Sequence, residues 1–390
     1  MLYKKKIKIL RIIPSLNPKY GGPSQATIYS SNILQKKGIK VDILTCDNKK
    51  EVFFRSSKIK IINKGPSLLG TYWFSLKLFF WLKRNKKKYD AFIVHGIWHF
   101  NTLMARLLIK KKYYVFLHGQ LDPFFKNDFI KLIKKKIYWF LFEKNNLLNA
   151  KSILLTSKGE MQTLKNTFVN TDKIIKNIVG YGIVKSKFNK KKAINIFYKK
   201  FPNFKNKKFL LFLGRFHEKK GCDILIKALN KLSKKNIKIN VFLAGPDVKF
   251  KNKLQILSKN YGLENNVFWS DIIVGDLKWG AISASSGMVL ASHGENFGVS
   301  LAESLSCSKP VLTTYKVNIY KEILKYKAGL VSKNKVNDFA KILEEFNNSN
   351  KSILKQFSKN SYNCFNQNFN LDSKNNGLVK FLKNQKNNFN

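Results

Sequence analysis

Short apolar runs alternate with amphipathic segments along the first half of the chain. Apolar runs at residues 7–13 and 40–45 predict two strands, and residues 24–37 between them predict a helix that stops at Gly38. Strand, turn and helix in repetition are typical of a parallel sheet covered by helices. Further strands are predicted in this half at residues 91–94, 113–117 and 152–155.

The same rhythm restarts near residue 208. The apolar run 209–213 predicts a strand that ends at Gly214, and residues 222–232 predict the helix after it. We therefore predict an α/β fold of two Rossmann-like domains in succession. Later elements are predicted as strands at residues 239–244, 288–291 and 310–313 and as helices at residues 299–306 and 357–369.

Length and composition agree with two folded domains. A chain of 390 residues exceeds the size at which a single core stops growing, and 44% hydrophobic against 25% charged residues is typical of globular proteins. Residues 185–207 are rich in Lys and Asn with little periodicity, which favours a linker and a surface excursion. The expected division is a first domain at 1–184, a linker region at 185–207, a second domain at 208–350 and a C-terminal helix and tail at 351–390 that could pack back on the first domain.

The chain is strongly basic, with 74 Lys and Arg against 22 Asp and Glu and a formal net charge of +52. Three explanations are open: drift towards the residues of AT-rich codons, attraction to anionic lipids and binding of nucleic acid. No nucleic-acid-binding motif is present, so we expect no nucleic-acid partner. Aromatic residues are interleaved with basic ones at 67–82 and 129–148, which favours a peripheral membrane contact. Both stretches could equally pack as helices on the first sheet.

Cysteine usage and the lack of a long apolar segment favour a cytoplasmic protein. The four cysteines are far apart and form no C-x-x-C pair, so neither a disulfide framework nor a zinc site is expected. Arg11 and Pro14 interrupt the first apolar run, which indicates a strand and not a signal peptide. No uncharged apolar stretch reaches the ~20 residues of a membrane-spanning helix. We expect a cytoplasmic location, with association at the inner face of the cytoplasmic membrane as an option.

Two cationic side chains follow the predicted strand at 209–213. Arg215 comes directly after Gly214, at the carboxyl edge of the sheet where open α/β folds bind ligands, and Lys220 follows a short loop later. Together they could clamp a diphosphate. A solvated basic loop is the alternative, but arginine is scarce in this chain, which makes Arg215 the more informative of the two.

Two carboxylates frame the start of the predicted helix at 299–306. Glu295 precedes the helix and Glu303 lies within it, with Gly298 between them. The free N–H groups of a helix N-terminus suit a phosphate. Rare acidic residues beside such a site therefore need another role, such as accepting hydrogen bonds from sugar hydroxyls. Alternatively, Glu303 is an ordinary surface residue and Glu295 interacts with the helix dipole.

The combined pattern resembles the C-terminal domain of the family 4, or group 1, glycosyltransferases. Its motifs are G-R-x-x-x-x-K-G, G-P, E-N-F-G-x-x-x-x-E and K-P-V. The resemblance implies the GT-B fold, in which two Rossmann-like domains face each other across a cleft. It also implies that Arg215 and Lys220 hold the donor diphosphate, that Glu303 binds the ribose and that Glu295 is catalytic. The other donor contacts that it implies are Asn296, Phe297 and Gly298 at the sugar and the backbone of Val299, Ser300 and Leu301 at the phosphates.

The first half of the chain resembles the same family. Gly22 lies in a Gly-rich loop after the first strand, where these enzymes keep a loop beside the donor phosphate. The stretch HGQLDP, which begins at His118, resembles the H-G-x-L-D-P element of a subset of the family, and implies that His118 is a second catalytic residue near the donor sugar. His95, His99 and Asp122 are candidates for the acceptor site. The two histidines lack the glutamate of H-E-x-x-H, which argues against a metal pair.

The resemblance implies a retaining glycosyltransferase that moves a hexose from a nucleotide-diphosphate sugar to a saccharide or lipid-linked acceptor, in surface polysaccharide or lipopolysaccharide synthesis. We expect no cofactor and no metal. The chain has no D-x-D motif, and Arg215, Lys220 and a helix N-terminus would stabilise the leaving diphosphate instead. Two alternatives stay open: a chain-extending enzyme similar to glycogen synthase, and a basic nucleic-acid-binding protein.

Overall fold

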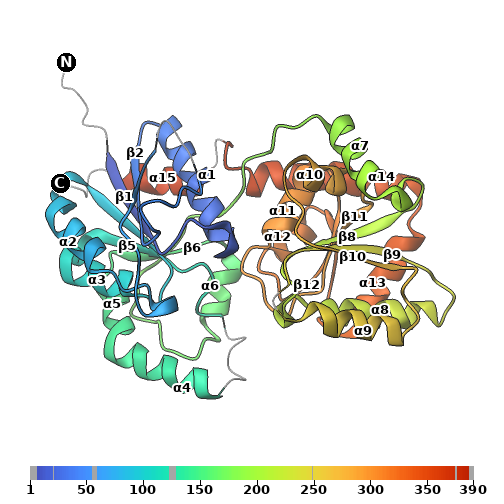
Figure 1. The fold of residues 1–390 in the computed structure, drawn as a ribbon, viewed down its shortest axis with the longest axis horizontal. Helices are drawn as coiled ribbons and strands as arrows, with labels where there is room; N and C mark the ends of the chain where they lie inside the picture. Colours follow the sequence, from blue (N-terminus) through green and yellow to red (C-terminus); the bar gives the residue numbers. More distant parts are fainter. Residues whose placement is uncertain are drawn as a thin grey trace. The chain divides into compact units, whose positions relative to one another are not determined.

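The protein is built from two units, each on its own parallel sheet (Figure 1). The computed structural model describes residues 7–20, 22–54, 59–122, 129–247, 249–373 and 376–385. Unit 1 comprises Met1–Ile183 and Leu371–Asn390, and unit 2 comprises Val184–Asn370. The chain therefore passes from one unit to the other twice, and the backbone N–H of Leu371 donates to the carbonyl of Ile183 at 3.0 Å.

Within the described residues, the sheet of unit 1 has seven strands in the order β3-β2-β1-β4-β5-β6-β7. β1 pairs in parallel with β2 on one side and with β4 on the other, so the direction of strand addition reverses between β1 and β4. Helices cover both faces, which is why the central strands are largely apolar. The strands are β1 (Lys8–Ile13), β2 (Lys40–Thr45), β3 (Lys60–Asn63), β4 (Ala91–His95), β5 (Tyr113–Phe116), β6 (Ser152–Leu155) and β7 (Lys176–Ile178).

The helices of unit 1 begin where the sequence supplies caps. The Ser75 hydroxyl accepts from the N–H of Leu78 at the start of α2, and Ser157 does the same for Glu160 at the start of α6. The α-helices are α1 (Gly22–Lys36), α2 (Leu76–Asn85), α3 (Phe100–Ile109), α4 (Phe129–Tyr138), α5 (Lys144–Leu148), α6 (Lys158–Leu164) and α15 (Gly377–Asn384). Shorter helical turns are η1 (Pro18–Tyr20), η2 (Gly70–Tyr72), η3 (Lys86–Lys88), η4 (Lys110–Lys112) and the π-helical η6 (Trp139–Glu143).

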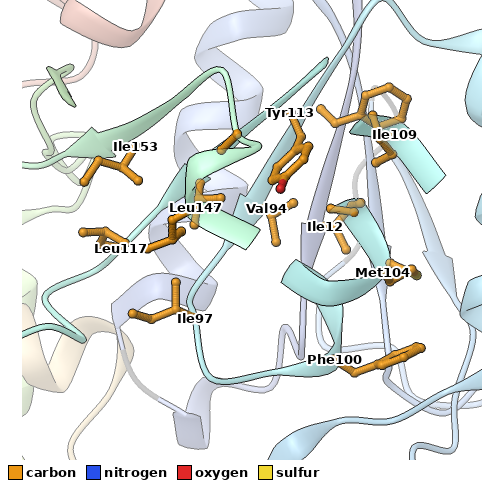
Figure 2. Packing of buried hydrophobic residues seen from close by; sticks show 14 of the residues in the cluster. Ile12, Val94, Ile97, Phe100, Met104, Ile109, Tyr113, Leu117, Leu147 and Ile153 are labelled. Carbon is orange, nitrogen blue, oxygen red and sulfur yellow. The ribbon is translucent and has the colours of Figure 1, made fainter. Parts of the chain in front are cut away.

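A hydrophobic core joins the sheet of unit 1 to α3 and α5 (Figure 2). Phe100 and Met104 lie one helical turn apart on α3 and are both buried, as the 3.6-residue period of a helix requires for a core-facing stripe. The labelled members of this cluster in Figure 2 are Ile12, Val94, Ile97, Phe100, Met104, Ile109, Tyr113, Leu117, Leu147 and Ile153.

Within the described residues, the sheet of unit 2 has six strands in the order β10-β9-β8-β11-β12-β13, again parallel. The prediction of a second parallel α/β sheet is therefore confirmed. The edge strands β10 and β13 were not predicted. The strands are β8 (Phe209–Leu213), β9 (Asn240–Ala244), β10 (Val267–Ser270), β11 (Gly287–Leu290), β12 (Val311–Thr314) and β13 (Gly329–Ser332).

Residues 185–207, where we expected a linker and a surface excursion, contain the helix α7 (Lys190–Lys200) and the turn η7 (Pro202–Phe204). α7 packs closely on α10, since a Cβ on Gly280 would lie 2.0 Å from the carbonyl oxygen of Ala193. The other helical elements of unit 2 are η8 (Glu218–Lys220), α8 (Cys222–Ser233), α9 (Lys251–Asn260), α10 (Gly275–Ala284), α11 (Val299–Ser306), α12 (Tyr320–Lys325), α13 (Val336–Asn348), α14 (Lys351–Cys364) and η9 (Phe365–Phe369).

The C-terminal segment belongs to both units. α14 and η9 lie in unit 2, whereas α15 lies in unit 1, where Phe381 meets the ring of Tyr114 edge-on at 5.2 Å. A Cβ on Gly377 would lie 2.4 Å from the carbonyl oxygen of Val179, so the start of α15 packs directly on the end of the first α/β segment. Among the helices that the structure describes, none has both the length and the apolar character to cross a membrane.

Candidate functional site

In unit 2 the predicted donor residues follow β8 and β11, which are neighbouring parallel strands. Because β8 pairs with β9 on one side and β11 on the other, the carboxyl ends of β8 and β11 form the point where the strand order reverses. Open α/β sheets bind ligands at such points. The fold therefore brings the loop of Arg215 and Lys220 next to the loop of Glu295.

Backbone contacts hold these two loops together. The carbonyl oxygen of Lys219 accepts from the N–H of His293 at 2.9 Å and from the hydroxyl of Ser292 at 2.7 Å. Gly221 has φ +66, and a Cβ there would lie 1.9 Å from the carbonyl oxygen of Ala291. Only glycine permits this approach, so the loop after β8 is fixed against the loop after β11.

Lys220 and Glu295 form an ion pair between the two loops. The Glu295 backbone is held in turn by the segment after β12, because its N–H donates to the carbonyl of Lys316 and its carbonyl accepts from the N–H of Asn318, each at 2.9 Å. Arg215 is exposed. The side chain of Lys220 passes beside Gly214, since a Cβ on that residue would lie 3.9 Å from Cε of Lys220.

Glu303 is nearly buried and paired with a residue that was not predicted. Its Oε1 lies 2.7 Å from Nζ of Lys278 on α10, and Glu303 is 9% exposed. Lys278 also lies 4.6 Å from the ring centre of Trp279. In so Lys-rich a sequence a single lysine carries little information, which is why this partner was missed. The surface-residue alternative for Glu303 does not fit its burial.

The segment between the two glutamates forms the start of α11. Gly298 precedes the helix with φ +73, in the left-handed region that favours glycine. Phe297 is buried, and its ring centre lies 5.4 Å from that of Phe369. Leu301, in the first turn of α11, is also buried. Asn296 accepts from Nδ2 of Asn318 at 3.3 Å. The other two members of the predicted set, Val299 and Ser300, are partly exposed in the first turn of the helix.

In unit 1 the predicted residues also gather where the strand order reverses, at the ends of β1, β4 and β5. Gly22 begins α1, and its carbonyl accepts from the hydroxyl of Tyr181 at 3.3 Å. The Tyr181 ring lies edge-on to His118, with centres 5.9 Å apart. Tyr181 thus links Gly22 to His118, and was not predicted. Gly21 of the glycine loop and Pro123 of the HGQLDP stretch lie outside the described residues.

His118 follows β5 in a left-handed conformation, with φ 52. A non-glycine residue rarely adopts this geometry, which clusters at functional sites. The His118 ring stacks on that of Phe116, with ring centres 4.7 Å apart, and Nε2 of His118 lies 2.8 Å from Nδ1 of His95. Burial, followed by the cation of Arg11, lowers the pKa of His118 to about 3. His118 is therefore a neutral ring at physiological pH.

The three acceptor candidates occupy different positions. His95 is 1% exposed at the end of β4, so it reaches a ligand only through His118. His99 precedes α3, and burial lowers its pKa to about 4. Asp122 is partly exposed, and its N–H donates to the carbonyl of Gly119 at 3.1 Å. Of the three, His99 and Asp122 are partly exposed, whereas His95 is buried.

No group of three His, Cys, Asp or Glu side chains that could hold a metal ion occurs in the described part of the chain. The described cysteines are all free, and three of the four are buried. The charged pairs of the site in unit 2 are Lys220–Glu295, which joins the two donor loops, and Lys278–Glu303, which joins α10 to α11.

Comparisons with solved structures agree with the two parallel sheets. Solved structures similar to the whole chain include sucrose-phosphate synthase from Thermosynechococcus elongatus, with a TM-score of 0.74, 17% identity and 98% of each chain covered. They also include HepE of Anabaena in complex with UDP-glucose, with a TM-score of 0.69, 14% identity, 97% of this chain covered and 100% of that one. These likenesses and the two parallel sheets define the GT-B glycosyltransferase fold, as predicted.

Sequence families define the group more closely. The model for glycosyl transferases group 1 matches residues 194–363, and the model for glycosyltransferase family 4 matches residues 20–176. An uncharacterized glycosyltransferase of Methanocaldococcus jannaschii is 26% identical over 350 residues, which cover 86% of this chain and 88% of that protein. The chain belongs to the family 4, group 1 glycosyltransferases, and is an enzyme of this class.

Proposed function

We propose that this glycosyltransferase transfers a hexose from a nucleotide-diphosphate sugar to a saccharide or lipid-linked acceptor, with retention of configuration and without a metal ion. The observation that carries the proposal is the Lys220–Glu295 pair beside Arg215, at the strand-order reversal of unit 2. A diphosphate leaving group needs positive charge, and a sugar needs hydrogen-bond acceptors. HepE of Anabaena, which has the same fold, was solved with UDP-glucose.

Each donor residue has a role in this proposal. Arg215 and Lys220 bind the diphosphate and stabilise its charge as the glycosidic bond breaks, while the N–H groups at the start of α11 add to the positive potential. Glu295 holds the transferred sugar through its hydroxyls. Glu303 binds the ribose and is oriented by Lys278. In unit 1, His118 donates a hydrogen bond to the donor sugar, and Asp122 contacts the acceptor.

The experiment that tests this function is a panel of UDP-, GDP- and ADP-sugars, scored by thermal stabilisation and by calorimetry. We expect one nucleotide class to bind, and Arg215→Ala to weaken its affinity by about 10- to 100-fold, because a charged hydrogen bond contributes about 1.5–3 kcal/mol. Arg84→Ala is the matched control, since Arg84 is an exposed arginine on α2 of unit 1. An unchanged nucleotide affinity in Arg215→Ala would exclude the proposed diphosphate contact of Arg215. If no sugar nucleotide binds, the proposal of a nucleotide-sugar donor is wrong.

The acceptor side of the proposal concerns the membrane, where enzymes of surface polysaccharide or lipopolysaccharide synthesis meet lipid-linked acceptors. α4 and η6 expose a stripe of apolar side chains at helical spacing, whereas Tyr138 and Trp139 point to the core of unit 1. Exposed lysines flank the stripe, and the chain is strongly basic. We propose that this stripe enters the headgroup region of an anionic cytoplasmic membrane. Its members are Ile130 (67% exposed), Ile133 (41%), Ile137 (55%), Phe140 (75%) and Leu141 (54%).

Replacing Ile137 and Phe140 together with Ser should weaken binding to vesicles that contain phosphatidylglycerol by at least about tenfold, because burying each such side chain contributes about 1.5–3 kcal/mol. Flotation of the full chain with phosphatidylglycerol and with pure phosphatidylcholine vesicles measures this. The matched control is Ile272→Ser with Val274→Ser, which are similarly exposed in unit 2, at 63% and 65%. Equal binding by both double variants would exclude the stripe as the contact.

A further inference from the structure

Unit 1 buries an arginine in the middle of its sheet. Arg11 on β1 is 2% exposed, and within the described ranges it forms no ion pair with a carboxylate. One guanidinium nitrogen, Nη1, donates to the hydroxyls of Ser30 and Ser31 at 2.6 and 2.9 Å and to the carbonyl of Thr27 at 3.1 Å, all on α1. Burying a charge without a counter-ion costs free energy. A hydrophobic side chain would satisfy a β-strand better, so stability alone does not account for Arg11.

A second guanidinium nitrogen of Arg11 donates to His95, which in turn is hydrogen-bonded to His118. Nε of Arg11 donates to Nε2 of His95 at 3.0 Å, and Nδ1 of His95 lies 2.8 Å from Nε2 of His118. A guanidinium only donates, so Nε2 of His95 is an acceptor and the proton of this neutral ring lies on Nδ1. That proton is donated to Nε2 of His118. The proton of His118 therefore lies on Nδ1.

We propose that Arg11 and His95 are positioning residues that hold His118 as a neutral ring with a proton on Nδ1. In this form His118 presents a hydrogen-bond donor, and Nδ1 cannot act as a general base. The partner would be an oxygen of the donor sugar, a role that rests on the proposed function. The protonation pattern itself depends only on contacts within unit 1.

The surroundings maintain this state across the physiological pH range. Burial and then the cation of Arg11 lower the pKa of both histidines, and the pKa of His95 falls further because of His118. The other titratable groups that face them are Tyr181, edge-on to His118, and Glu160, which accepts from the N–H of Gly119 at 2.8 Å. The Thr27 hydroxyl, 3.5 Å from Nδ1 of His95, is too distant to compete with His118.

The orientation of the His118 ring is fixed as well as its protonation. The ring stacks on Phe116 with an interplanar angle of 10°, and Tyr181 closes against its edge. Phe116 also stacks on His95, at 11°, so the two imidazoles and the phenyl ring share nearly one orientation. A ring held in this way directs its Nδ1–H along one line, which is what a donor of fixed geometry needs.

The protonation pattern can be measured without any substrate. The chain has five histidines, so ¹⁵N-histidine labelling of the full chain and long-range ¹H–¹⁵N spectra, assigned with single His→Gln variants, resolve each ring. We expect His95 and His118 to show a protonated Nδ1 and an unprotonated Nε2 from pH 6 to 8. A proton on Nε2 of His118, or a doubly protonated ring in this range, would overturn the proposal.

Two replacements of equal length, both of which remove the Nη1 contacts with α1, separate donation to His95 from packing. Arg11→Gln places an N–H near the position of Nε, whereas Arg11→Met places a methyl group there. We expect Gln to keep the protonation pattern and, with the donor found above, a rate within about fivefold of the original. Met should abolish the protonation pattern, lower kcat by about 10- to 100-fold and leave nucleotide affinity unchanged.

The matched control is Lys8→Met, which removes a cation from the same strand at the Asp42 pair, away from the histidines. Identical behaviour of Arg11→Gln and Arg11→Met, in spectra and in rate, would overturn the proposal. If no sugar nucleotide is turned over, the proposed function fails, whereas the spectra still decide the protonation pattern. The two failures are therefore distinguishable.

Discussion

Replacing Lys220 with Met should lower kcat by about 10²- to 10³-fold, the usual cost of removing one group that stabilises developing charge. Lys220 is the cation that the fold brings closest to Glu295, and its stem crosses the glycine before Arg215. In the proposed reaction it moves from the glutamate towards the leaving diphosphate. Glu295→Gln should lower kcat by a similar factor, because the sugar loses one hydrogen-bond acceptor and Lys220 loses the carboxylate with which it pairs.

The two residues act as one unit, so their effects should not add. We expect the double variant Lys220→Met, Glu295→Gln to be little slower than the slower single variant, measured as kcat and KM with the identified donor. The control pair is Lys235 and Glu344, 3.1 Å apart on the surface of the same unit. Removing that pair should change the rate by less than about twofold, since exposed pairs contribute little. Full turnover by Glu295→Gln would exclude a catalytic role for this carboxylate.

The parallel sheets were predictable because their central strands are buried on both faces. The run Phe209–Leu213 is apolar throughout, and Lys8–Ile13 is apolar except for Lys8 and Arg11. The edge strands β3 and β7 are short, partly exposed and contain Lys and Asn, so they resemble the loops around them. The strength of the signal in the sequence therefore follows the degree of burial.

Helix α7 was missed for a related reason. Within it, Ala193 and Phe197 are buried one turn apart, while seven lysine, asparagine or tyrosine positions dominate the stretch. A stripe of two apolar residues lies below what periodicity can distinguish from a loop. Its place in unit 2 depends on Gly280, which lets α10 approach its backbone, and that contact is not visible in the local sequence.

The candidate site shows the same division between local and distant information. The spacing of Glu295 and Glu303 and the glycine before α11 are local, so they could be read from the sequence. Lys220 was also predicted, from its place in the loop after residues 209–213, but its ion pair with Glu295 was not. Lys278 comes from another element and is one among many lysines, so it was not predicted. Arg11 did carry a usable signal, because a scarce arginine interrupts a buried apolar strand. We used it only to argue against a signal peptide.

Gly221→Ala should destabilise unit 2 by about 4 kcal/mol or more, the range of severe core defects, and should also weaken donor binding. A Cβ at this position would lie 1.9 Å from the carbonyl oxygen and 2.6 Å from the carbonyl carbon of Ala291, and both atoms are backbone. The added Cβ can be accommodated only if the loop after β8 moves away from the loop after β11. That movement would separate Lys220 from Glu295 and break the contacts of Lys219 with Ser292.

Calorimetric unfolding measures this effect, with the transition of unit 2 expected to fall by about 10 °C, since 1 kcal/mol shifts a domain of this size by about 2–4 °C. Gly262→Ala is the matched control. It has nearly the same φ, +65 against +66, but nothing lies within 4 Å of the added Cβ. It should therefore show only the strain of a left-handed residue, about 1–2 kcal/mol. Equal destabilisation by the two variants would mean that backbone strain, and not the approach of the two donor loops, makes glycine necessary at position 221.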